Sequence, residues 1–445
     1  MMQLEVEWHS TPDEGDPLEC RTWARLIWRA GPHVLTRAHD RRARGERDGI
    51  FVPLYPLARW FVSNWWSLLY ETWPAGEFPP PGSATTPDVN HWLHTHCARV
   101  ALSGYAFPYA CIVSRGRDVG LISRSDPRGR YARTPVEFTE DAEWYCGREV
   151  VSRALAGFID DVLTHIDELR FSDERTEALR SDWAAIRSPG ASEAEFCRAA
   201  GRLGLDPYDT ATWSAPVLSW FTHSQPGELD RAFASDLLEA PDPAESKPKR
   251  YAAFRGLVDQ FALTSAAQNF GPVMKDPSAH AEGYALARWI RQTLGLSLEQ
   301  RLEDLRDAAR AACQHEMLVA ESTNIPSGRV LAAVGWKANP GPTVIARPSP
   351  KENARFLWGR GLYLALRGAT AGPRLVTDAR TWEQRGSRAF GAELLAPQDG
   401  VVPMYKIEEA EIGRDAALAK VAAHYNVSSM LIEHQLNNAR SMDVG

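Results

Sequence analysis

Short apolar runs and helix-like segments alternate in the first third of the chain. The segment YACIVSRGRDVGLISR, residues 109–124, contains β-like apolar runs interrupted by glycine. The segments PLARWFVSNWWSLLYETWP (56–74) and VNHWLHTHCARVAL (89–102) instead repeat large apolar side chains at helical spacing. This mixture of short strands and helices predicts an α+β domain over residues 1–135.

The apolar period lengthens after residue 135. Three segments place apolar residues three and four positions apart: VVSRALAGFIDDVLTHIDEL, DERTEALRSDWAAIR and SEAEFCRAAGRLGLDPY. They predict a helical domain over residues 136–238. The next segment, EAPDPAESKPKR (239–250), is rich in proline and charge and poor in large apolar residues, which predicts a linker.

Residues 251–445 combine helical segments with a β-like stretch, RVLAAVGWKANPGPTVIARP (329–348). Helix-like segments such as RFLWGRGLYLALRG (355–368) follow it. We therefore expect a multidomain α+β protein that is mostly helical, with its third domain over residues 251–445.

Composition narrows the class of protein. The chain has 445 residues, of which 44% are hydrophobic and 24% are charged, and its net charge is −7. These values are ordinary for a soluble globular protein, and the negative charge argues against polyanion binding by the whole molecule. Six scattered cysteines favour neither a disulfide framework nor a zinc ribbon, and the acidic N-terminus lacks the pattern of a signal peptide. We expect a cytoplasmic protein with no membrane partner.

The last 165 residues resemble the ImmA/IrrE family of metallopeptidase-like proteins. Four pieces carry the resemblance: EGYALARWIRQTLGL (282–296), GPTVIARP (341–348), the Arg355-Phe356 pair that opens a helix, and SRAFGAELLAP (387–397) followed by VAAHYNVSSMLIEHQL (421–436). The resemblance implies a zincin-like domain over residues 251–445. It also implies a His-Glu-x-x-His motif beginning four residues after the phenylalanine.

That motif is degenerate in this chain. Two histidines four residues apart would share a zinc ion, and the intervening glutamate would accept a proton from the bound water. The corresponding positions hold Arg360, Gly361 and Leu364, and an arginine has no lone pair for a metal. Glu383 is a candidate remnant of the third ligand. We expect no cofactor, no catalytic zinc and a pseudopeptidase, with Arg360 buried and paired with Glu383 or Asp378.

The resemblance implies a role by binding another protein, in bacterial regulation, stress response, toxin-antitoxin systems or defence against phage and mobile elements. The partner would then be a regulator or a defence or toxin component. Two alternatives stay open. One is an active hydrolase with a non-standard site, because His91, His94 and Cys97 lie at helical spacing that suits a metal.

The other alternative is a nucleic-acid-binding regulator. Arginines that are dense in the N-terminal domain could follow a phosphate backbone. The candidate residues are Arg115, Arg117, Arg124, Arg128, Arg130 and Arg133.

Overall fold

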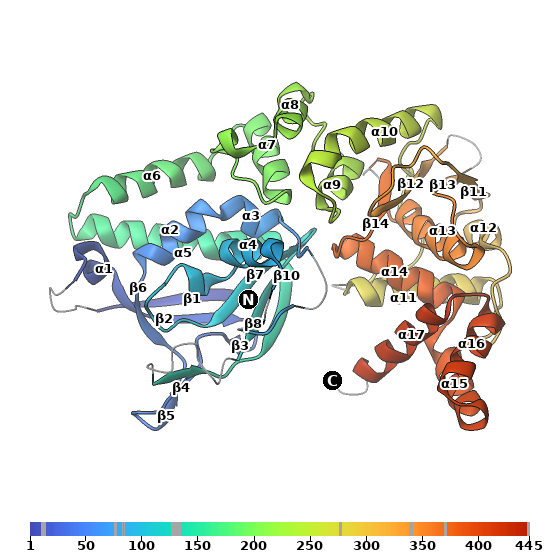
Figure 1. Ribbon diagram of the computed structural model, residues 1–445, viewed down its shortest axis with the longest axis horizontal. Helices are drawn as coiled ribbons and strands as arrows, with labels where there is room; N and C mark the ends of the chain where they lie inside the picture. Colours follow the sequence, from blue (N-terminus) through green and yellow to red (C-terminus); the bar gives the residue numbers. More distant parts are fainter. Residues whose placement is uncertain are drawn as a thin grey trace. The chain divides into compact units, whose positions relative to one another are not determined.

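The computed structural model describes residues 1–9, 15–74, 78–81, 83, 85–125, 135–275, 278–337, 341–368 and 372–442 (Figure 1). The chain folds as two units, Met1–Ser214 and Ala215–Gly445. The apolar cores follow the same division, because each buried cluster is drawn from one unit alone. The predicted α+β class is confirmed, since both units combine sheets with helices.

Antiparallel strands organise the N-terminal unit. In its first sheet β2 pairs with β1, β3 and β6, and every second residue of β2 is buried, which is the period expected of a strand with one face on a core. A second sheet has the order β10-β8-β7, and a small third sheet has the order β5-β4-β9. The strands are β1 (Met2–Trp8), β2 (Trp23–Ala30), β3 (His33–Val34), β4 (Ala38–Asp40), β5 (Gly45–Arg47), β6 (Ile50–Pro53), β7 (Tyr109–Arg115), β8 (Asp118–Arg124), β9 (Val136–Phe138) and β10 (Ala142–Gly147).

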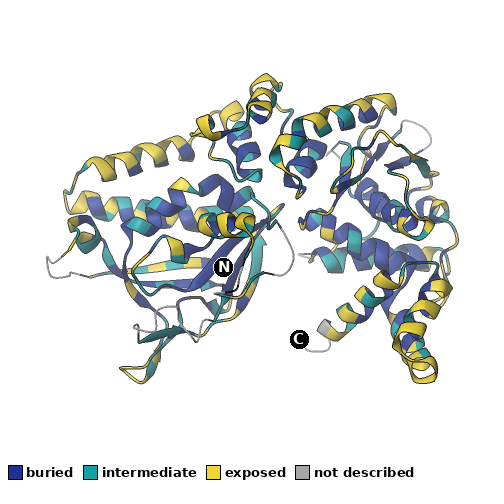
Figure 2. Cartoon of the chain, viewed as in Figure 1, coloured by how far each residue is buried: buried dark blue, intermediate teal, exposed yellow. Residues whose placement is uncertain are grey.

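Helices pack on these sheets through aromatic side chains. The tryptophan-rich segment forms two helices that meet at Asn64, and Phe61 contacts the ring of Phe158 from α5 edge-on. Figure 2 shows mostly exposed positions along α6 and buried ones on the helices below it. The helices are α1 (Pro17–Arg21), α2 (Tyr55–Ser63), α3 (Trp65–Tyr70), α4 (Pro87–His96), η1 (Ala98–Val100), α5 (Arg148–Glu168), α6 (Glu174–Arg187), α7 (Ala191–Arg202) and η2 (Thr210–Thr212).

The C-terminal unit contains a four-stranded sheet of order β11-β13-β12-β14. β11 runs parallel to β13, and the other two pairings are antiparallel. The strands are β11 (Leu318–Glu321), β12 (Val330–Trp336), β13 (Pro342–Ala346) and β14 (Arg374–Thr377). The helices are α8 (Ala215–His223), α9 (Ala232–Glu239), η3 (Ala244–Ser246), α10 (Lys247–Gln260), α11 (Ala279–Thr293), α12 (Leu305–Cys313), α13 (Lys351–Leu366), α14 (Trp382–Leu395), α15 (Gln398–Ile412), α16 (Arg414–Tyr425) and α17 (Ser429–Met442).

Glycines set the close packing of α13 and α14. A Cβ atom on Gly361 would lie 2.5 Å from Val344 of β13, so α13 rests directly on the sheet at this point. A Cβ atom on Gly283 of α11 would lie 2.5 Å from the carbonyl oxygen of Gly386 in α14. Because these helices approach backbone to backbone, α14 is held between α11 and α13, as Figure 1 shows.

The domain boundaries differ from the predicted ones. The division falls after Ser214, and the helices predicted as a separate domain over residues 136–238 are split between the two units. The segment predicted as a linker, residues 239–250, contains η3 and the start of α10. Its Lys247 is buried and donates to the carbonyls of Leu237, Leu238 and Ala240 at 2.6 to 2.9 Å. Burial lowers the pKa of Lys247 to about 7.

Candidate functional site

Arg360 lies in the middle of α13 and is almost fully buried. Its Nε donates to Ser387 Oγ at 3.2 Å, and its Nη2 donates to Thr377 O at 2.6 Å and to Gln384 Oε1 at 3.0 Å. Burial lowers the pKa of the guanidinium well below its ordinary value, and the nearby charge of Arg388 adds to this effect. Neutral oxygens therefore stabilise a charge that has been removed from water.

A carboxylate, that of Asp236, is connected to Arg360 through the side chain of Gln384. Gln384 Nε2 donates to Leu375 O at 2.7 Å and to Asp236 Oδ1 at 3.4 Å. Asp236, which belongs to α9, accepts two hydrogen bonds of 2.8 Å from the guanidinium of Arg374. Burial acts to lower the pKa of Arg374, but the bidentate pair with Asp236 outweighs it, and the pKa is raised. Gln384 thus links Arg360 by hydrogen bonds to the buried ion pair of Asp236 and Arg374.

The predicted partner of Arg360 was Glu383 or Asp378, but its guanidinium donates to neither of them. Glu383 lies in the first turn of α14 and is partly exposed, and Asp378 is exposed and pairs with Arg329 at 3.5 Å. The side chain on α14 that faces Arg360 is Gln384, one residue beyond Glu383. The acid that completes the network comes from α9, which the helical pattern of α13 and α14 could not indicate.

The residues at the positions predicted for the motif, Arg360, Gly361 and Leu364, do not fit a zinc ion. Arg360 fills its surroundings with a hydrogen-bonded cation. Gly361 faces Val344 and Val334 of the sheet, and Leu364 is buried in the apolar core. A glutamate side chain at position 361 would clash with Val344 of the sheet. Among the described residues no group of three or more His, Cys, Asp or Glu side chains could hold a metal ion.

A basic cleft lies beside Arg360, in the C-terminal unit. Its volume is about 650 Å³, which is in the range of ligand-binding sites. The elements around it are α11, α13, α14 and α17, which lie together in Figure 1. Four arginines, two histidines and one aspartate line it: Arg347, Arg360, Arg385, Arg388, His280, His434 and Asp378. Apolar side chains complete the wall, among them Phe356, Leu357, Met430 and Leu431.

The positive charge of the basic cleft is poorly compensated. The pKa of Arg388 is lowered to about 10, chiefly by burial and also by the charges of Arg380 and Arg385, against the opposing effect of Asp378. Burial also lowers the pKa of His280, as do Arg385 and Arg288. The Nε2 atom of His280 is buried and has no hydrogen-bond partner in the described part of the chain. Both the poorly compensated positive charge and the unpartnered Nε2 atom of His280 would therefore favour an anion in the basic cleft.

The residues predicted as an alternative metal site do not form a complete ligand set: His94 and Cys97 line one cavity, which His91 does not reach, and no described group of three His, Cys, Asp or Glu side chains could hold a metal ion there. His91 and His94 are exposed on α4, whereas Cys97 is buried beyond the end of that helix. The neighbouring His96 is buried, with Nδ1 2.7 Å from Ile112 O and Nε2 3.0 Å from Glu71 Oε2. These two bonds use both ring nitrogens, so His96 serves the packing of α4 against β7.

The three described arginines of the predicted nucleic-acid-binding set do not form one surface. Arg115 ends β7 and stacks over the ring of Tyr145, while Arg124 ends β8 and pairs with Glu143. The β7–β8 register places them at opposite ends of the hairpin, about 20 Å apart. Arg117 lies in the exposed turn of that hairpin. Arg128, Arg130 and Arg133 lie outside the described residues.

Arg360 and Asp378 of the basic cleft were named by the sequence analysis, whereas Arg385, Arg388 and His280 were not predicted as site residues. Arg388 lies within SRAFGAELLAP, and Arg385 lies two residues before that segment. Both lie on α14 within four residues of Gln384, and this spacing was the sequence signal that could have indicated a shared site. His280 lies about 100 residues earlier in the chain. Only the packing of α11 against α14 brings it to the basic cleft.

Comparison with known proteins gives one informative similarity. No family model matches the sequence, and no solved structure matches it. A type II secretion system protein L from Pseudomonas aeruginosa is 28% identical over 247 residues, which cover 51% of this chain and 58% of that protein. The chain thus spans less than two thirds of the length of this relative. None of the described helices is both long and apolar enough to cross a membrane.

This similarity overturns the functional prediction. A role in bacterial regulation, stress response or defence, with a hydrolase or a nucleic-acid-binding regulator as alternatives, is wrong by this comparison. The similar protein is named as a component of a secretion system. The coarser expectation of a protein partner agrees with that name, while a regulator or defence component as the partner has no support.

Proposed function

We propose that this chain is a binding component of a multi-protein assembly, and that the basic cleft receives an acidic, partly apolar segment of a partner protein. The observation that carries the proposal is the composition of the basic cleft, in which four arginines face one aspartate. A carboxylate in such a place forms charge-assisted hydrogen bonds, which are roughly twice as strong as neutral ones.

The shape of the basic cleft supports a peptide rather than a small anion. Its volume of about 650 Å³ is far larger than one carboxylate or phosphate needs. Its apolar wall would contact side chains of a segment whose carboxylates meet the arginines. Met430 is 65% exposed at the rim, and flexible methionine side chains adapt to different apolar partners.

The name of the similar protein is consistent with a role in an assembly. Its printed name assigns it to a type II secretion system, and the similarity extends over 247 residues. We carry over only the general idea of a component that works by contact with other proteins. No reaction is proposed, since the residues at the centre of α13 do not fit a catalytic metal.

The zincin-like fold of the C-terminal unit belongs to the same proposal. Support comes from the order of elements, in which α11 precedes β13, and α13 and α14 carry the motif positions and SRAFGAELLAP. In this interpretation Arg360 and its acceptors occupy the place of a metal centre. The basic cleft beside them would then be a former substrate groove that still binds peptide.

A selection from random peptides tests the binding proposal. The whole chain is immobilised and a library of twelve-residue peptides displayed on phage is selected against it. Because the basic cleft is cationic and partly apolar, the recovered sequences should be enriched in Asp, Glu and large apolar residues. Arg385→Glu, an exposed change in the basic cleft, should abolish that enrichment.

The matched control is Arg306→Glu, which makes the same change on α12, outside the basic cleft, at a side chain that is 55% exposed. It should leave the enrichment intact. Recovered peptides without an acidic bias, or an acidic bias that survives Arg385→Glu, would refute the proposal.

A further inference from the structure

Two buried cysteines of the N-terminal unit face each other beside a second cavity. Cys97 follows α4 and Cys111 lies in β7, and the two form an isolated antiparallel bridge. Both are free thiols, and they hydrogen bond to each other. Facing residues of an antiparallel pair have Cα atoms about 4.5 to 5.5 Å apart, which lies within the range that a disulfide spans.

The surroundings of Cys97 favour its thiolate. Its sulfur accepts from the thiol of Cys111 and from the backbone N–H groups of Arg99 and Ala110, and the Arg99 guanidinium adds positive charge. Together these lower the pKa of Cys97 despite its burial. The pKa of Cys111 is raised, chiefly by burial. One thiol of the pair is thus prepared as a nucleophile while the other keeps its proton.

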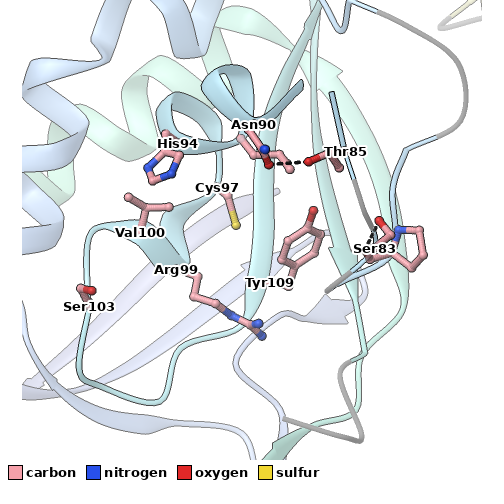
Figure 3. Close-up of a pocket in the computed structure, with 11 residues that line it drawn as sticks. Ser83, Thr85, Asn90, His94, Cys97, Arg99, Val100, Ser103 and Tyr109 are labelled. Carbon is pink, nitrogen blue, oxygen red and sulfur yellow. Dashed lines mark hydrogen bonds between the residues drawn. The ribbon is translucent and has the colours of Figure 1, made fainter. Parts of the chain in front are cut away.

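A cavity of about 290 Å³ gives small molecules access to Cys97. Figure 3 shows the Cys97 sulfur among the labelled side chains of this cavity, with Tyr109 and Arg99 nearby. Hydroxyl and amide groups of Thr85 and Asn90 also line it, so its wall is partly polar. Its size admits a small polar oxidant and excludes a folded protein.

We propose that Cys97 and Cys111 form a redox-active pair that reacts with a small hydroperoxide. The Cys97 thiolate attacks the terminal oxygen of the hydroperoxide, the O–O bond breaks, and the alkoxide leaves as an alcohol after taking a proton. Cys97 becomes a sulfenic acid. The Cys111 sulfur then attacks Cys97, the S–O bond breaks, and water leaves as the disulfide forms. Two thiols and one hydroperoxide thus give one disulfide, one alcohol and one water.

The test treats the whole chain with one equivalent of hydrogen peroxide, alkylates the remaining thiols and maps the tryptic peptides. Cleavage after Arg99 separates the two cysteines, so the disulfide would join peptides 60–99 and 100–115. We expect this joined pair as the main product, even though the thiols of Cys20 and Cys146 are more exposed. Oxidation that follows exposure, with Cys20 or Cys146 modified first, would overturn the proposal.

Variants and pH separate the two roles. Cys111→Ser should leave a sulfenic acid on Cys97 that dimedone labels, whereas Cys97→Ser should give no label at position 111. In the unchanged chain, alkylation of Cys97 should reach half its maximal rate at a lower pH than that of Cys146, because burial raises the pKa of Cys146 to about 11. At neutral pH the rate ratio should be at least about tenfold. Equal rates would contradict a reactive Cys97 even if a variant misfolds.

Discussion

Arg360 carries a positive charge into the interior of the C-terminal unit, and its acceptors explain why the fold tolerates it. Three hydrogen bonds of 2.6 to 3.2 Å link its guanidinium to β14 and α14. Gln384 accepts one of them and also accepts from the backbone N–H of Thr377 at 3.0 Å. An arginine at this position therefore ties α13 to two other elements, and its burial is offset by bonds rather than by water.

Replacing Arg360 by alanine should lower the free energy of unfolding by about 3 kcal/mol, because buried acceptors lose their donor and a cavity opens. Denaturant titration of the whole chain measures the change. The control Arg306→Ala removes an exposed arginine and should cost less than about 1 kcal/mol. Similar small losses for both variants would contradict a structural role for Arg360.

At the scale of elements, the contact of α13 with the sheet rests on the absence of a side chain at Gly361. The Val344 methyl groups would lie 2.5 and 2.8 Å from an added Cβ atom. Glycine weakens a helix by up to about 1 kcal/mol relative to alanine, so close packing has to outweigh that loss. The same contact means that a glutamate could not be accommodated at position 361 without moving the helix.

Gly361→Ala should destabilise the protein by about 1 to 3 kcal/mol, since overpacking exceeds the gain in helix propensity. Gly256→Ala is the matched control, because Gly256 lies in α10 with no atom within 4 Å of an added Cβ. That variant should be neutral or stabilising by up to about 1 kcal/mol. Thermal unfolding of both variants measures the difference. A stabilising effect of both changes would show that α13 can shift away from the sheet.

The helices were largely predictable because their burial follows the apolar period. The segments predicted around residues 150–169, 282–296 and 355–368 fall in α5, α11 and α13. The structure of residues 239–250 was not predictable from the sequence, because the prolines and charges of this segment are typical of a linker. In the structure, Lys247 donates to the carbonyl groups at the end of α9. Hydrogen bonds from a buried lysine to carbonyl groups seven to ten residues earlier leave no periodic pattern in the sequence.

At the scale of the whole molecule, two units with separate apolar cores carry separate sites. The basic cleft belongs to the C-terminal unit, and the thiol pair belongs to the N-terminal unit. The positions Arg360, Gly361 and Leu364 could be singled out from residues that are close in sequence. Their neighbours Asp236 and His280 could not be predicted, because they lie 80 or more residues before Arg360 in the chain and only tertiary packing brings them near.

The central claim is that the basic cleft binds acidic segments, and one binding measurement tests it most directly. A labelled peptide from the selection is titrated with the whole chain at two salt concentrations, and fluorescence anisotropy gives the dissociation constant. We predict that Arg385→Glu weakens binding at least about tenfold, equivalent to about 1.4 kcal/mol, that Arg306→Glu has no such effect, and that salt weakens the unchanged complex. Equal affinity of the unchanged chain and Arg385→Glu at both salt concentrations would contradict the account.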